Sequence, residues 1–104
     1  MNAKFKSYLG LSRKSGNMIL GLDRIEESDK EIFALIFSND VSERTFKKVL
    51  YKANCKTVIQ TDMTMTELGK LLGAQKIGAA AVTDKGLANQ IIINAGGNTY
   101  GNDQ

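Results

Sequence analysis

The sequence predicts an α/β protein, a three-layer α/β/α sandwich with a mixed, largely parallel four-stranded sheet. Short apolar segments alternate with amphipathic helical segments, the order expected when helices cover both faces of a sheet. With 104 residues, 42% of them hydrophobic, the chain is large enough for one domain with its own core. We expect that domain over residues 1–94, followed by a flexible polar tail over 95–104.

The first helix is expected close to the start of the sequence. Its apolar face has helical spacing and consists of Phe5, Tyr8 and Leu9. Gly16 offers a left-handed end to this helix. A short extended segment is expected at 17–20, and helical spacing returns over 22–27, after Gly21.

The most apolar segment, IFALIF at 32–37, is typical of a strand that is covered on both faces. Ser42 is a favourable N-cap for a helix over 42–54, and Val41 and Phe46 have the spacing of a hydrophobic staple. Basic residues repeat every four positions along one ridge of this helix: Arg44, Lys48 and Lys52.

The next segments repeat the alternation. TVIQ at 57–60 predicts a strand, and Thr64 with Glu67 three positions later predicts a capping box at the start of a helix. Gly73 is expected to end that helix.

The last predicted strand, GAAAV at 78–82, is made of small residues, and Asp84 after it can cap the final helix. Because these side chains have almost no volume, either a packed helix or the backbone of an external ligand should approach this strand closely.

Several classes of site are excluded by residue types that are rare or missing. The sequence has no His and a single Cys, Cys55, so a His-based triad, a His-containing zinc site, a Cys₄ site and a disulfide framework cannot form within one chain. No run of about 18 apolar residues and no secretory signal is visible, so we expect a cytoplasmic protein without membrane contact.

Charge is distributed in blocks, although the net charge is only +3. Residues 1–20 carry four basic residues and no acid, residues 22–43 carry seven acids, and residues 44–56 are again basic without an acid. If the fold brought the first and third blocks together, it would have one basic face suited to an anionic partner.

An enzyme is one alternative. Asp40, Asp62 and Asp84 each follow a predicted strand, and carboxylates at the ends of parallel strands could hold magnesium. Aspartate at such positions also caps helices and starts turns, and the sequence has no phosphate-binding glycine loop. We therefore expect a non-catalytic protein without a metal or cofactor, and a metal-dependent enzyme is the less favoured alternative.

A binding site is predicted from two segments. The turn at Gly21 enters a helix, whose first N–H groups suit anions. The second segment is a loop that leads into the small-residue strand and consists of Lys76, Ile77, Gly78 and Ala79. If the fold brings both segments to one end of the sheet, Lys14 and Arg24 are expected to contact phosphates there, while Ile77 contacts bases.

Four segments, YLGLSRKSGNMILGLDRI, SNDVSERTFKKV, TELGKLLG and IGAAAVTDKGLA, resemble in order and spacing the ribosomal L-seven-Ae superfamily, in its small bacterial branch. The resemblance extends over residues 4 to about 90. It implies an α/β/α sandwich that binds kink-turns, which are sharply bent RNA helices with tandem sheared G·A pairs, within a ribonucleoprotein.

The family's RNA-binding motif, G-x-N-E-x-x-K, is only partly matched. Gly21 matches its glycine, whereas Asp23, Arg24 and Glu27 stand where Asn, Glu and Lys are expected. An ionised Asp only accepts hydrogen bonds, and an acid at position 27 repels phosphate. An alignment of the motif that starts from Asn17 fits its charged positions no better. The loop at 76–79 matches the family's second RNA-contacting loop more loosely.

The sequence as a whole predicts a monomeric, non-catalytic RNA-binding protein, associated with the ribosome, whose partner is a bent or loop-containing RNA. The alternative is a protein-interaction module of the same fold that has lost RNA binding. Such a module would use the acidic segment 22–31.

Overall fold

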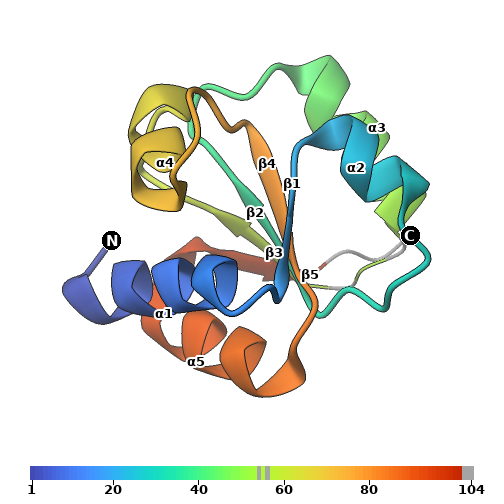
Figure 1. The fold of residues 1–104 in the computed structure, drawn as a ribbon. Coiled ribbons are helices and arrows are strands. Elements are labelled where there is room, and N and C mark those ends of the chain that lie inside the picture. Colours follow the sequence, from blue (N-terminus) through green and yellow to red (C-terminus); the bar gives the residue numbers. More distant parts are fainter. Residues whose placement is uncertain (54, 56, 102–104) are drawn as a thin grey trace.

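The computed structural model describes residues 1–53, 55 and 57–101 (Figure 1). Its elements are, in order, α1 (Ala3–Lys14), β1 (Met18–Leu20), α2 (Leu22–Glu27), β2 (Ala34–Phe37), α3 (Glu43–Ala53), β3 (Thr57–Gln60), α4 (Met65–Leu72), β4 (Ala79–Val82), α5 (Lys85–Ala95), the 3₁₀ helix η1 (Gly96–Asn98) and β5 (Thr99–Gly101). The predicted α/β class and the predicted order of elements up to α5 are confirmed. The expected end of the third helix at residue 54 and the basic residue Lys56 lie outside the described residues.

The sheet is more mixed than the sequence predicted. Five strands lie in the order β1-β4-β2-β3-β5, where four were expected. Only β2 and β3 pair in parallel, and the other three pairs are antiparallel. The prediction of a largely parallel sheet is therefore wrong.

The direction of β4 explains the difference. After α4, the chain folds back so that the amide of Ile77 donates a hydrogen bond to the carbonyl oxygen of Met65, the first residue of that helix (3.0 Å). The chain therefore enters β4 at the end of the sheet where it left β3, and β4 must run antiparallel to β2. Alternation of helices and strands in a sequence does not reveal such a return.

The C-terminal segment also differs from the predicted tail. Residues 99–101 form β5, which pairs with β3 in the register Thr57↔Gly101 and Ile59↔Thr99. This pairing uses backbone groups, so the polar composition of 95–104 gave no signal for it. Residues 102–104 of the expected tail lie outside the described residues.

Helices cover both faces of the sheet, as predicted for a three-layer sandwich (Figure 1). The buried residues of α1, α4 and α5 pack together on one face, and those of α2 and α3 pack on the other. The basic segments around α1 and α3 therefore lie on opposite sides of the sheet. The condition under which the first and third charge blocks would form one basic face is therefore not met.

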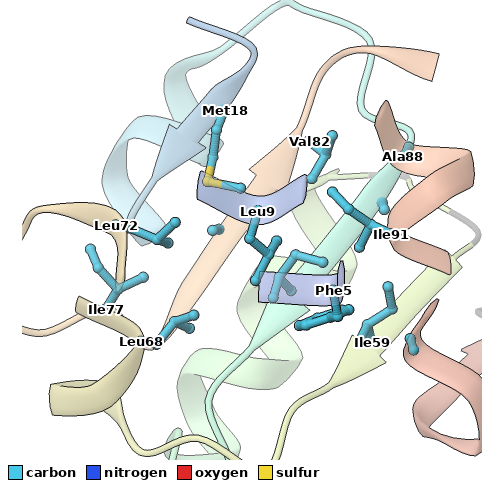
Figure 2. Packing of buried hydrophobic residues seen from close by; sticks show 14 of the residues in the cluster. Phe5, Leu9, Met18, Ile59, Leu68, Leu72, Ile77, Val82, Ala88 and Ile91 are labelled. Carbon is cyan, nitrogen blue, oxygen red and sulfur yellow. The ribbon is translucent and has the colours of Figure 1, made fainter. Parts of the chain in front are cut away.

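The two faces of β2 carry the two cores. Ala34 and Ile36 belong to the core under α1, α4 and α5, part of which is seen in Figure 2, whereas Leu35 and Phe37 belong to the core under α2 and α3. All four side chains are fully buried, as predicted for a strand covered on both faces. The sequence pattern IFALIF is therefore explained by the two helical layers.

The small residues of β4 are explained in the same way. Ala80 lies in the first core, and Ala79 and Ala81 lie in the second, where α2 packs over the strand. The sequence allowed either a packed helix or the backbone of an external ligand close to this strand. In the structure, helices of the protein itself pack there.

Local signals at the helix ends are confirmed. Thr64 and Glu67 form the complete capping box of α4, and Gly73 ends this helix with a φ of 75°. Asp84 accepts a hydrogen bond from the amide of Leu87 at the start of α5 (2.8 Å). None of the helices in the described part of the chain has the length and apolar character needed to cross a membrane.

Candidate functional site

The turn at Gly21 and the loop that precedes β4 lie side by side. The amide of Gly21 donates a hydrogen bond to the carbonyl oxygen of Ala79 (2.9 Å), which continues the antiparallel pairing of Leu20 with Ala80. The carbonyl oxygen of Gly78 accepts in turn from the amide of Ser38, at the end of β2 (3.0 Å). We call this end of the sheet, where residues 21, 38–41 and 76–79 meet, the Gly21–Gly78 end.

Gly21 has a backbone conformation that favours glycine. Its φ of 89° and ψ of 154° are the N-cap conformation of α2, and no side chain caps this helix at that position. A Cβ built on Gly21 would meet nothing within 4 Å. The backbone conformation, and not crowding, therefore requires the glycine, and the start of α2 is left open to solvent.

Gly78 is glycine for a different reason. A Cβ there would lie 3.3 Å from Cγ2 of Val41 and 3.4 Å from Sδ of Met65. The loop after β2 and the first turn of α4 thus close around this position from inside the protein. The small residue at 78 is explained by internal packing, without an external ligand.

Two of the predicted contact residues are buried. Ile77 is 7% exposed and packs with Leu68 and Leu72 in the first core (Figure 2). Ala79 is 2% exposed and lies in the second core. The expectation that the Ile77 side chain projects from a loop tip to contact bases is wrong. An isoleucine between polar loop residues looks exposed in the sequence, but the return of the chain toward Met65 turns it inward.

The charged candidates around this end are exposed. Asp23, Arg24 and Glu27 lie on α2, whose buried residue is Ile25, and Lys76 lies in the loop before Ile77. Arg24 and Lys76 place two cations on the two segments that the Gly21–Ala79 hydrogen bond holds together. The acidic side chains of α2 are exposed on the same helix as Arg24.

Lys14 lies at the opposite end of β1. Asn17, which follows the turn after α1, accepts a hydrogen bond from the amide of Thr83 (2.9 Å), at the end of β4 remote from Gly78. A strand of three residues spans about 10 Å, and it separates Asn17, which follows α1, from Gly21. The prediction that Lys14 belongs to the site is not supported. Its neighbour Arg13 donates from Nε to the carbonyl oxygen of Leu72 (3.2 Å) and thus satisfies the end of α4.

The three aspartates that suggested a metal site have separate hydrogen-bonding roles. Asp40 accepts from the amide of Met65 (2.9 Å), and Asp84 caps α5 at the opposite end of the sheet, because β4 is antiparallel. Asp62 accepts from the ammonium group of Met1 (2.7 Å), and this hydrogen bond lowers the pKa of the Asp62 carboxyl. Within residues 1–53, 55 and 57–101, no group of three potential metal ligands comes together.

The sequence interpretation did not include Asn39 and Ser38. Asn39 is exposed at the Gly21–Gly78 end, and its side-chain amide donates to the carbonyl oxygen of Asp62 (3.1 Å). Ser38 is fully buried, and its hydroxyl has no hydrogen-bond partner in the described part of the chain. Their position directly after the buried strand β2 was the available signal, since strand ends collect polar groups.

Comparisons with known proteins support the fold. The structure is similar to a solved structure described as a protein with unknown function from Bacillus halodurans, with a TM-score of 0.77 and 22% sequence identity. The similarity covers 90% of this chain and 98% of the other chain. No protein-family model matches the sequence. No curated protein matches it either.

Proposed function

We propose that this protein is a non-catalytic RNA-binding protein that recognises a bent or loop-containing RNA at the Gly21–Gly78 end. The observation that carries the proposal is the 2.9 Å hydrogen bond from Gly21 to Ala79, which joins the two segments that the sequence singled out as the binding site. As a ribosome-associated protein it would act in the cytoplasm as a monomer, without a cofactor.

The corrected site is smaller than the sequence suggested. Arg24 and Lys76 would contact phosphates, because both side chains are exposed and lie on adjacent segments. The backbone around Gly21 would approach the RNA closely, since a Cβ position there is open and Gly21 has no side chain in the way. Ile77 and Ala79 would support the loop from the interior instead of contacting RNA.

The acids on α2 set the expected specificity. Asp23 and Glu27 are exposed close to the proposed phosphate contacts, where they repel the backbone of an RNA. An ionised Asp23 also cannot donate a hydrogen bond to a base edge. We therefore expect weaker binding to a standard kink-turn than a site with Asn and Lys at these positions would give.

A titration of a kink-turn RNA and a plain duplex of equal length, at low and moderate salt, tests the proposal. Arg24→Glu should weaken binding of the kink-turn. Glu27→Lys should strengthen this binding and should steepen the dependence of the affinity on salt concentration by the amount expected for about one more phosphate contact. Lys85→Glu, an exposed change on α5, is the charge-matched control. If both RNAs fail to bind below about 10 µM at low salt, where even nonspecific contacts are measurable, the proposal is wrong.

A second candidate, a protein-interaction module, is favoured by the exposure of the acidic segment. Its acids are all exposed, and they are Asp23, Glu26, Glu27, Asp29 and Glu31. A basic protein partner would pair with them, and its binding would be weakened by Glu27→Lys. The same substitution thus has opposite effects under the two functions, which separates them.

A further inference from the structure

Helix α3 carries an exposed surface of cations around an aromatic ring. Tyr51 is 74% exposed, and the surrounding basic side chains are exposed as well. Four residues line one open hollow on this helix: Lys47, Lys48, Tyr51 and Lys52. We call these residues, together with Arg44, the α3 basic face.

The rest of α3 explains why this face stays uncovered. Val49 is fully buried in the second core, and Phe46 packs against Phe37 with ring centroids 4.6 Å apart. These contacts hold the helix on the sheet through its opposite side. Tyr51 therefore has no role in anchoring α3, and its ring is left in water.

The spacing of the charges on this face destabilises the helix. Arg44, Lys48 and Lys52 follow one another at intervals of four residues, where like charges repel. Among the described residues, the acid that pairs with this face is Glu43, which contacts Lys47 at 3.0 Å. Both groups of that pair are exposed, so it neutralises little of the positive charge.

We propose that the α3 basic face binds single-stranded RNA, with Tyr51 stacking on a base and the lysines around it contacting the flanking phosphates. An exposed aromatic ring can stack on a base only where the base is unpaired, because a duplex buries the faces of its bases. The cations at positions −4 and −3 relative to Tyr51, Lys47 and Lys48, are its neighbours on the helix surface, and Lys52 lines the same hollow. A membrane surface would need more apolar area than this one ring.

The position of α3 relates this surface to the Gly21–Gly78 end. α3 starts four residues after Asn39, which lies at that end, and Tyr51 is about 12 Å further along the helix at 1.5 Å per residue. A strand that leaves a bent RNA at the Gly21–Gly78 end would have α3 beside it. The inference does not depend on the proposed function, because the two surfaces use different residues.

The test is fluorescence anisotropy with a labelled ten-nucleotide oligouridine and the full chain at low salt. Tyr51→Ala should weaken binding about 5-fold or more, the loss expected for one base stack, whereas Tyr51→Phe should bind within about 2-fold of the original protein. Lys48→Gln and Lys52→Gln should each weaken binding and lower the salt slope by about 0.7. All these side chains are exposed, and unchanged melting curves would verify folding.

Matched controls distinguish a site from general charge. Lys70→Gln on α4 and Lys85→Gln on α5 remove exposed lysines from the other side of the sheet and should leave the affinity nearly unchanged. The inference is overturned if these controls weaken binding as much as Lys48→Gln, if Tyr51→Ala has no effect, or if a duplex competes better than oligouridine. It is also overturned if a polyglutamate peptide or anionic vesicles bind in a Tyr51-dependent way and oligouridine does not.

The proposed function at the Gly21–Gly78 end and the proposal for the α3 basic face can be rejected independently of each other. Arg24→Glu should leave the Tyr51 dependence of oligouridine binding unchanged, and Tyr51→Ala should not change binding of a kink-turn RNA trimmed of single-stranded flanks. Loss of kink-turn binding with retained Tyr51-dependent oligouridine binding would reject only the proposed function.

Discussion

The amide of Gly21 donates a hydrogen bond to the carbonyl oxygen of Ala79 at a distance of 2.9 Å. These residues are far apart in the sequence, and the antiparallel pairing of β1 with β4 brings them together. The hydrogen bond fixes the turn into α2 beside the loop that precedes β4. The two segments of the proposed RNA site lie side by side because of this pairing.

Gly21→Ala should destabilise the protein by about 1–3 kcal/mol, because a φ of 89° with a ψ of 154° is accessible almost only to glycine. The space around a Cβ is open, so the loss comes from backbone strain and not from a clash. Urea denaturation measures it. A cost below about 0.5 kcal/mol would show that the turn relaxes into another conformation.

Two glycines in helices should respond in opposite ways to alanine. Gly10→Ala in α1 should stabilise the protein by up to about 1 kcal/mol, since its Cβ would meet nothing within 4 Å and alanine is the better helix former. Gly69→Ala in α4 should cost about 1–3 kcal/mol, because the Cβ would lie 2.6 Å from the carbonyl oxygen of Gln75. Thermal unfolding of both variants checks the contrast, and equal shifts would contradict it.

Ser38→Ala should raise the free energy of unfolding by up to about 1 kcal/mol, because the buried hydroxyl has no hydrogen-bond partner in the described part of the chain. Thr61→Val is the matched variant. The hydroxyl of Thr61 is also buried but donates to the carbonyl oxygen of Phe37 (2.8 Å), so its loss should cost about 1–2 kcal/mol. Denaturant unfolding of both variants measures the difference in stability. Destabilisation by Ser38→Ala would mean that the Ser38 hydroxyl does make a hydrogen bond.

Cys55 should react slowly with iodoacetamide at neutral pH in the folded protein and quickly in urea. The side chain is 3% exposed, and burial raises the pKa of its thiol, although backbone hydrogen bonds with Thr57 and Leu35 lower it in part. Labelling followed by mass spectrometry gives both rates. Equal rates in buffer and urea would mean that the second core opens easily.

The same pKa shift predicts a pH dependence. Because the pKa of the Cys55 thiol is raised above its ordinary value of 9.0 in the folded state, its contribution to stability is full below that value and is lost as the pH rises through the folded value. Stability should therefore fall above pH 9.0, and Cys55→Ala should remove this part of the fall. Denaturation curves between pH 7 and 10 test it, and identical pH profiles for both proteins would contradict it.

Local structure was predictable wherever its cause lies within a few residues. The Thr64–Glu67 capping box and the left-handed end of α4 at Gly73 depend on neighbouring groups only, and both form as predicted. The apolar run of β2 also predicted burial on both faces. The two segments of the candidate site, Gly21 and 76–79, lie side by side as the sequence interpretation required, but Ile77 and Ala79 are buried.

The errors arise from long-range contacts. The direction of β4 depends on the hydrogen bond between Ile77 and Met65, and the same return of the chain buries Ile77 in the first core. Lys14 is close to Gly21 in sequence, yet β1 separates them, because an extended strand carries its ends apart. Sequence periodicity describes one element at a time and contains neither relationship.

The sequence by itself determined the α/β class, the helix caps and the requirement for two helical layers, because helix propensity, capping and hydrophobic periodicity act over a few residues. Only the tertiary structure decided the antiparallel course of β4, the pairing of residues 99–101 with β3 and the separation of the two basic helices. Those features depend on which backbone groups and apolar faces meet across the sheet, and that choice minimises the free energy of the whole chain rather than of any one segment.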